Sequence, residues 1–455
     1  MKKIILITLL TFAITAKSQE SNNTNTENPA TKSYSFSLEQ AITHALINNY
    51  SAINAGRDIE SAKKKKWETT AMGLPQINSS LDYQNNIELQ KSLIPAEFFG
   101  GNKGEFMEVA FGTRHNMTAR ATLSQLLFDG SYIVALQASK TYLKYYENAK
   151  IKTDIDTKEM VINAYGNVLL AEEGIIILEK NKATLEKTLF DTKETFKNGL
   201  IEEENVEQLQ ITLTSINSNI NYNKRLLDVS YKMLKIALGI DIDADLKLTD
   251  KLDNLTISNL DMAFSQTGFN VGNNINYQMA QNFQQQKELE LKLEKSKALP
   301  TLSANVNFGY NAFGNQFQFF TQNQKWLNYS NLGISLNVPI FSSLARTARA
   351  QQAKIALDKA KTQLTETEQR LKLQYANAKS EYEFSIEEYE TAKTNLSLAE
   401  RIEKKQQIKF TEGLSSSFDF NDAQRQLYAA QQKYLQTMVE IINKKASLEK
   451  VINKI

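Results

Sequence analysis

Four segments of the chain alternate apolar and polar residues with a period of two. In the first, Ile77 and Tyr83 share one face, while the positions between them on the other face carry amides, hydroxyls and one carboxylate. The same alternation recurs at about 116–124, 302–310 and 332–338. Period two is typical of a β-strand with one apolar face. Each segment extends to about 10 residues, the length at which a tilted strand crosses a bilayer.

Elsewhere the apolar residues recur at helical spacing, in segments rich in Lys, Glu, Gln, Leu and Ala. Proline is absent between Pro95 and Pro300 and again after Pro339. The pattern predicts helices over about 38–72, 131–197, 203–239, 270–297, 343–410 and 418–453. The two longest would reach about 100 Å at ~1.5 Å per residue.

The order helix, strand, strand, long helix, turn, helix occurs twice. "GLPQI" from Gly73 matches "ALPTL" from Ala298, and "QLLFDGS" matches "NVPIFSS". The turns at Gly199 and Gly413 lie 214 positions apart (413 − 199). The sequence therefore predicts an internal duplication, with a first repeat over 36–240, a linker over 241–268 and a second repeat over 269–455.

The N-terminus has the pattern of an export signal. "MKKIILITLLTFAITAKSQE" combines two lysines, a short apolar run and a small-residue cleavage site, which predicts a signal peptide over 1–18. The apolar run is shorter than the ~20 residues of a spanning helix, and no later stretch is predicted to span either. The polar residues 19–35 are expected to form a disordered tether.

Composition removes several classes of function. The charges nearly balance, with 53 Lys+Arg against 51 Asp+Glu, so we expect no binding of nucleic acid. The chain has no Cys, which excludes disulfides, thiolate metal sites and an acyl-cysteine lipid anchor. "GGNKG" at 100–104 lacks the spacing of a phosphate-binding loop and is interpreted as a turn. We predict no catalytic residue, no cofactor and no metal site, and therefore not an enzyme.

Four strands of this kind cannot close a barrel alone. Small closed membrane barrels have about eight strands, and an open sheet edge in lipid leaves backbone groups unsatisfied. Several copies of the chain must therefore pool their strands, with the long helices beneath them as a tube. Symmetric closure then encloses a continuous pore.

Aromatic residues gather in the connections between the strands. The first connection contains four phenylalanines between 98 and 111. In the second, the predicted membrane-interface aromatics are Phe313, Phe319, Phe320, Trp326 and Tyr329. The alternative is a hydrophobic core beneath a soluble loop.

With these features together, the chain resembles the TolC-type outer membrane efflux proteins over about 36–454. The resemblance implies a fold that is mainly α with membrane β: a homotrimer whose protomers each contribute four strands to a 12-stranded barrel, above a long α-helical periplasmic barrel. It also implies residence in the outer membrane of a Gram-negative bacterium, contact with outer membrane lipid, and docking of a periplasmic adaptor protein and an inner-membrane pump.

The resemblance also assigns roles to the two turns. It places them at the periplasmic tip, where an adaptor docks; these residues are Gly199, Leu200, Gly413 and Leu414. It places Asp419 and Asp422 around a closable aperture, where mutual repulsion between carboxylates would raise their pKa values. The alternative is structural: Ser416 or Ser417 caps the following helix, and Asp419 suits its first turn.

Three positions depart from the family pattern. Where the best-known members carry a Tyr, an Arg and an Asp that lock the closed aperture, this chain has Phe410, Ser415 and Asn205. None of these can form the corresponding ion pair, and Phe410 has no hydroxyl to donate. We expect a lock that is looser or differently built.

Two other functions compete. An exported coiled-coil scaffold or adhesin without a pore would share the long helices but not the four strands. An enzyme would need a nucleophile motif or cofactor loop that the sequence does not offer. The sequence leaves open whether drugs, metal ions, siderophores or polypeptides would be exported.

Overall fold

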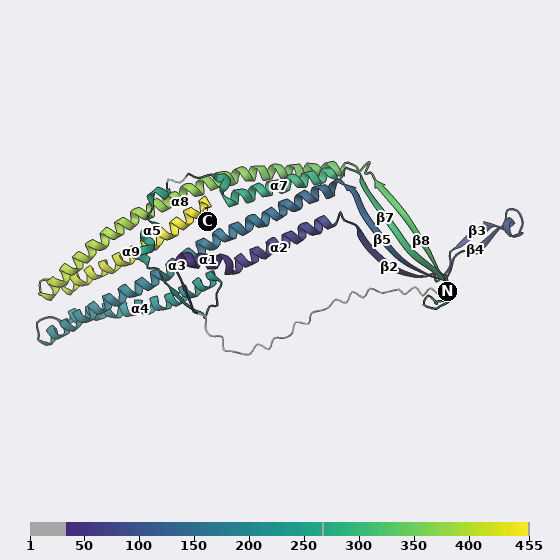
Figure 1. The fold of residues 1–455 in the computed structure, drawn as a ribbon. Coiled ribbons are helices and arrows are strands. Elements are labelled where there is room, and N and C mark those ends of the chain that lie inside the picture. The colour runs from purple at the N-terminus through teal and green to yellow at the C-terminus, as the bar shows by residue number, and fades with distance from the viewer. Residues whose placement is uncertain (1–32, 266–267, 454–455) are drawn as a thin grey trace.

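The computed structural model describes residues 33–265 and 268–453 and is strongly elongated (Figure 1). A β-sheet lies at one end, and two long helical hairpins end in turns at the other. The helices are α1 Leu38–Asn48, α2 Tyr50–Ala71, α3 Gly130–Lys197, α4 Glu203–Leu238, α5 Leu252–Asn259, α6 Met262–Ser265, α7 Ile275–Ser296, α8 Ala345–Thr411 and α9 Ser417–Ile452. The strands are β1 Ser33–Phe36, β2 Gln76–Asn85, β3 Lys91–Pro95, β4 Phe106–Ala110, β5 His115–Asp129, β6 Asp245–Leu248, β7 Thr301–Gly314 and β8 Trp326–Asn337. The predicted signal peptide and most of the predicted tether lie outside the described residues.

The four predicted strands are confirmed as β2, β5, β7 and β8, which form one antiparallel sheet in that order. They contain 10, 15, 14 and 12 residues, so three are longer than expected. Leu123, Val306 and Leu332 lie side by side across three strands on one face. Thr122, Asn307 and Asn331 do the same on the opposite face. The sheet therefore has one apolar and one polar face.

The long helices are confirmed, since α3 has 68 residues and α8 has 67. Within the helical layer α2 packs on α3, α3 on α7 and α7 on α8, while α4 and α9 fold back along α3 and α8 (Figure 1). The main core lies midway along the molecule. There the fully buried Tyr165 donates a hydrogen bond to the carbonyl of Phe36 (3.1 Å), and the fully buried Tyr382 donates one to that of Asn259 (2.6 Å). Each long helix thus holds the middle segments through one tyrosine.

The prediction of one helix over 38–72 is wrong, because the chain breaks at Asn49. The Asn49 side chain accepts from the backbone N–H of Ser51 (2.8 Å) and donates to the carbonyl of Ala237 (2.8 Å). At this point α4 ends on Gly239, where an added Cβ would lie 2.0 Å from the carbonyl oxygen of Asn48. This close approach of another helix end, not local propensity, separates α1 from α2.

Two further pairs of strands and two short helices were not predicted. β1 pairs in parallel with β6, so residues 33–35, expected to belong to the tether, lie in a strand, and the linker carries β6, α5 and α6. β3 and β4 form a hairpin that extends beyond the sheet (Figure 1). Its tip contains Gly100 and Gly104 at positive φ (84° and 91°), which confirms the turn predicted at 100–104.

Within the described part of the chain, α3 is long and apolar enough to cross a membrane by length and composition, contrary to the sequence prediction. This helix also supplies Val161, Val168 and Leu169 to the buried core. Packing between helices therefore accounts for its apolar character.

Candidate functional site at the two helical turns

The turns that end the two hairpins have the same conformation. Gly199 and Gly413 both adopt left-handed φ angles, 72° and 73°, which glycine adopts without strain. The backbone N–H of Leu200 donates to the carbonyl of Thr195, five residues back, and that of Leu414 donates to Lys409 at the same spacing. The leucine side chains are 75% and 78% exposed at the end of the molecule. The predicted turns are confirmed, and each presents one apolar side chain to solvent.

Asp419 lies in the first turn of α9, as the structural alternative predicted. Ser416 is the N-cap residue: its hydroxyl oxygen accepts from the backbone N–H of Asp419 (3.2 Å), and its O–H donates to the Asp419 carboxylate (2.8 Å). This side-chain hydrogen bond lowers the pKa of Asp419. In a single chain the direction is thus opposite to the rise that we expected from repulsion within a ring of carboxylates.

Asp422 lies one turn further along α9 and is partly exposed. Its carboxylate pairs with Arg425 (2.8 Å) and accepts a hydrogen bond from Gln426 (2.7 Å). Both partners lie on the same helix, so Asp422 does not hold the two hairpins together within one chain.

The three residues at the family's lock positions do not interact with one another through any hydrogen bond in the described chain. Phe410 stacks on Phe420 with ring centroids 5.3 Å apart, and Phe420 is fully buried. Ser415 donates to the side chain of Gln406 (3.1 Å), and Asn205 donates to the carbonyl of Glu202 (3.2 Å). Both rings also pack in an apolar cluster that contains Leu209 of α4, so Phe410 contributes apolar packing near both hairpins, where the family's Tyr would donate a hydrogen bond.

A connection between the hairpins does exist, but at residues that the sequence analysis did not select. Asn421 on α9 donates to the side chain of Gln208 on α4 (3.1 Å) and accepts from the hydroxyl of Thr212 (3.1 Å). Further from the turns, Asn181 on α3 donates to Gln431 on α9 (2.7 Å). We call Gln208, Thr212 and Asn421 the neutral link. Polar residues at this spacing are common on exposed helix faces, so only the packing of α4 against α9 distinguishes them.

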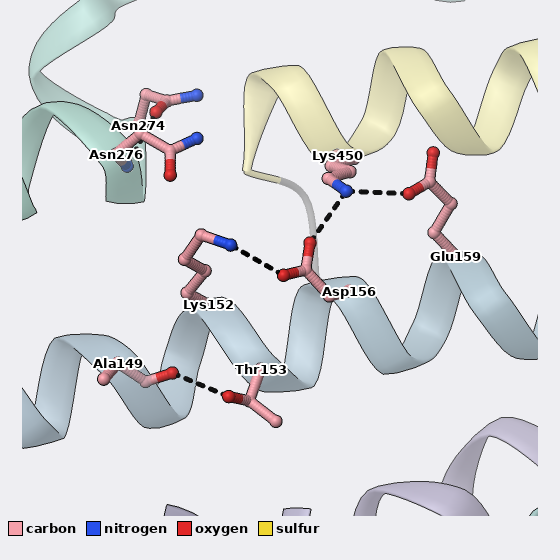
Figure 2. Close-up of polar contacts among 8 residues, drawn as sticks. All are labelled: Ala149, Lys152, Thr153, Asp156, Glu159, Asn274, Asn276 and Lys450. Carbon is pink, nitrogen blue, oxygen red and sulfur yellow. Dashed lines mark hydrogen bonds and ion pairs between the residues drawn. The ribbon is translucent and has the colours of Figure 1, made fainter. Parts of the chain in front are cut away.

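A charged cluster joins α3 to α9 nearer the middle of the molecule (Figure 2). Lys450 on α9 contacts Asp156 (2.7 Å) and Glu159 (2.8 Å) on α3, and Asp156 also pairs with Lys152 (2.8 Å). Burial by itself would raise the pKa of Asp156, but the hydrogen bonds from Lys152 and Lys450 lower it. Burial likewise opposes the charge of Lys450, yet its two carboxylate partners raise its pKa. The cluster ties the end of α9 to the first repeat.

The polar face of the sheet carries hydrogen bonds between side chains on neighbouring strands. Thr122 donates to Asn307 (2.7 Å), and Asn307 donates to Asn331 (2.9 Å). A second pair, Thr118 and Asn311, is joined at 3.0 Å. This face is satisfied by hydroxyls and amides, which are suited to contact with water.

The predicted interface aromatics divide between different surroundings. Phe319 is only 2% exposed and packs with Met117, Ala312 and Trp326 on the apolar face, so the core alternative applies to it. Phe320 is exposed. The register places Phe313 opposite Asn116 and Tyr329 opposite Gly309, which puts both on the polar face. For the other four residues a position at the membrane interface stays a prediction.

Comparison with known proteins agrees with this geometry. Residues 272–454 match the family model described as outer membrane efflux protein. No curated protein matches the chain in sequence. VceC from Vibrio cholerae has a similar structure, with a TM-score of 0.70 at 14% identity over 91% of this chain and 96% of that one. The Campylobacter jejuni CmeC outer membrane channel gives 0.70 at 17% identity (91% and 85%), and the open state of the Neisseria gonorrhoeae MtrE outer membrane channel gives 0.68 at 16% (91% and 88%). The resemblance to the TolC-type fold is confirmed.

Proposed function

We propose that the chain, which has the fold of the outer membrane efflux channels and matches their family model over residues 272–454, is the outer membrane duct of an export system. Three copies pool their strands into a 12-stranded barrel, and their helices form a tube through the periplasm. One observation carries the proposal above the others: a sheet with an apolar face and two unpaired edges stands at one end of long helical hairpins.

The residues that follow the second turn are proposed to line the aperture at the inner end of the tube. Three copies would place Asp419 and Asp422 in rings of carboxylates, which attract cations. The neutral link between α4 and α9 takes the place of the family's ionic lock, because Phe410, Ser415 and Asn205 are occupied elsewhere.

The exposed leucines at the turns are proposed to dock a periplasmic adaptor that connects the duct to an inner-membrane pump. Leu200 and Leu414 are apolar, exposed and presented by identical turns, which suits a repeated contact. Exchange of both for serine is expected to abolish export in cells while leaving the conductance of the purified protein unchanged. Unchanged export would exclude the turns as the docking surface.

Single-channel conductance in a planar bilayer tests the duct and the aperture together. Wild-type protein is expected to give small, uniform, cation-preferring steps, and Asp419→Ala/Asp422→Ala to give larger steps without that preference. The matched control is Glu203→Ala/Glu207→Ala, which removes two carboxylates from the other hairpin. Absence of conductance from every protein would refute the duct.

The competing candidate is an exported coiled-coil scaffold without a pore. The long helices suit it equally well. It leaves unexplained the exposed apolar residues of β2 and β8, such as Ile77 and Leu332, on strands of bilayer length. Oligomers that fractionate with the outer membrane and change mobility on heating would exclude the scaffold.

A further inference from the structure

The two borders of the protomer are open. β2 and β8 are the outer strands of the sheet, and α2 and α8 are the outer members of the helical layer (Figure 1). All ten residues of β2 are exposed. Unpaired edge strands are templates for pairing with another chain. The pairing of these edges between neighbouring copies rests on the proposed function. The internal duplication determines the register of this pairing.

The two repeats are equivalent at the level of individual residue pairs. Pro75 and Pro300 differ by 225 positions (300 − 75), and Phe128 and Phe341 differ by 213 (341 − 128). Gln76 pairs with Ser124 in the first repeat; these shifts convert the pair to Thr301 and Asn337 (76 + 225 and 124 + 213). Thr301 and Asn337 are indeed partners in the second repeat. The other end agrees, because Asn85 with His115 converts to Tyr310 with Asn328.

The seam between the repeats is a template for the seam between copies. Inside the chain β5 pairs with β7, which joins the second strand of one repeat to the first strand of the other. Thr122 lies opposite Asn307, and Phe128 lies opposite Leu302 beyond a bulge. At the rim Leu299 packs so closely on Gly130 that a Cβ there would lie 2.5 Å from its Cδ1 atom.

We propose that β8 of one copy pairs with β2 of the next copy in the register of this internal seam. By these shifts, the pair Thr122 and Asn307 corresponds to Ser335 in β8 of one copy and Asp82 in β2 of the next (122 + 213 and 307 − 225). The same shifts convert Phe128 and Leu302 to Phe341 and Ile77 (128 + 213 and 302 − 225). Leu336 then lies opposite Leu81 on the apolar face, and Ser335 opposite Asp82 on the polar face. A slip by one residue would break this match of faces.

The inference accounts for the exposed apolar residues at the rim. Ile77 is 77% exposed and Phe341 is 82% exposed in the single chain. The loop that carries Phe341 has a defined backbone conformation in the single chain, with left-handed φ angles of 48° at Ser343 and 64° at Leu344. The Arg346 guanidinium fixes this loop by donating to the carbonyls of Pro339 (2.9 Å) and Ile340 (3.2 Å).

Because the chain has no cysteine, disulfide trapping tests the register directly. Ser335→Cys/Asp82→Cys, purified from membranes and oxidised, is expected to form a ladder of covalent oligomers on a non-reducing gel. The controls are Ser335→Cys/Ser80→Cys and Ser335→Cys/Gln84→Cys, whose partners are displaced by two residues. Diagonal neighbours in a sheet are about 7–8 Å apart, beyond the reach of a disulfide, so we expect at least about fivefold less product.

The outcomes separate this inference from the proposed function. Stronger trapping in either displaced pair, or none in any pair of an assembly that is oligomeric by size, overturns the register and leaves the duct intact. A protein that is monomeric in membranes and detergent, without trapping in any pair, overturns both. In a ring, the cysteine of a single variant lies far from the same cysteine in the neighbouring copies. A single variant that forms as much covalent product as the double variant therefore also refutes the pairing of β8 with β2.

Discussion

Removal of Asn421 is the sharpest test of the neutral link. Asn421→Ala deletes one hydrogen bond to Gln208 and one from Thr212, both across the boundary between the two hairpins. A neutral hydrogen bond contributes about 0.5–1.5 kcal/mol net, and water can replace part of each in this half-buried position. We therefore expect the closed arrangement to lose about 1–2 kcal/mol, which raises the ratio of open to closed channels about 5- to 30-fold.

Open probability in single-channel recordings measures this ratio. The matched control is Asn223→Ala, which removes a hydrogen bond of similar length (2.9 Å) that stays within α4. Thr212→Val in the Asn421→Ala background is expected to add little, because its partner is already absent. Equal open probabilities for Asn421→Ala and Asn223→Ala would refute the reasoning, since the bond between the hairpins would then contribute no more than one within a helix.

Three further predictions concern the middle of the molecule. Lys450→Met is expected to lower the free energy of unfolding by about 1 kcal/mol, measured by denaturant titration, because the ion pairs of Lys450 with Asp156 and Glu159 are partly exposed. The pKa of Asp156 is lower in the folded chain than in the unfolded chain. Its ionised carboxylate therefore stabilises the fold above the unfolded pKa, and this stabilisation is lost as the pH falls through the folded pKa. Wild type is expected to lose stability below about pH 4, and Lys450→Met to lose less. Gly239→Ala is expected to prevent folding or to lower the melting temperature strongly, since its Cβ would lie 2.0 Å from the carbonyl oxygen of Asn48 at a φ of 72°.

The sequence was most informative where structure is local. Alternation of apolar and polar residues locates β2, β5, β7 and β8, and helical spacing with the turn glycines Gly199 and Gly413 locates both hairpins. These signals depend on neighbouring residues only. The match between the two repeats adds long-range information, because equivalent segments must form equivalent contacts.

The elements that escaped prediction depend on distant partners. β1 is a short strand that exists because β6, more than 200 positions away, pairs with it in parallel (Ser33 with Asp245). Asn49 breaks a helix because another helix ends against it. The neutral link was missed for the same reason: Asn421 is one of many polar residues on α9, and only the position of α4 gives it partners. The burial of Phe319 likewise depends on how its loop folds over the sheet.

The polar face of the sheet has a consequence for whatever passes along it. Over the four described strands, Asp82 and Arg120 carry opposite charges on this face, and Asp129 caps α3 at the rim; the remaining positions are mostly amides and hydroxyls. In the proposed barrel a solute therefore meets groups that can both donate and accept weak hydrogen bonds, whatever its own sign. Such a surface discriminates between solutes by their size and hydration. The outer end of the barrel would therefore release substrates that have already been selected at an earlier stage of export.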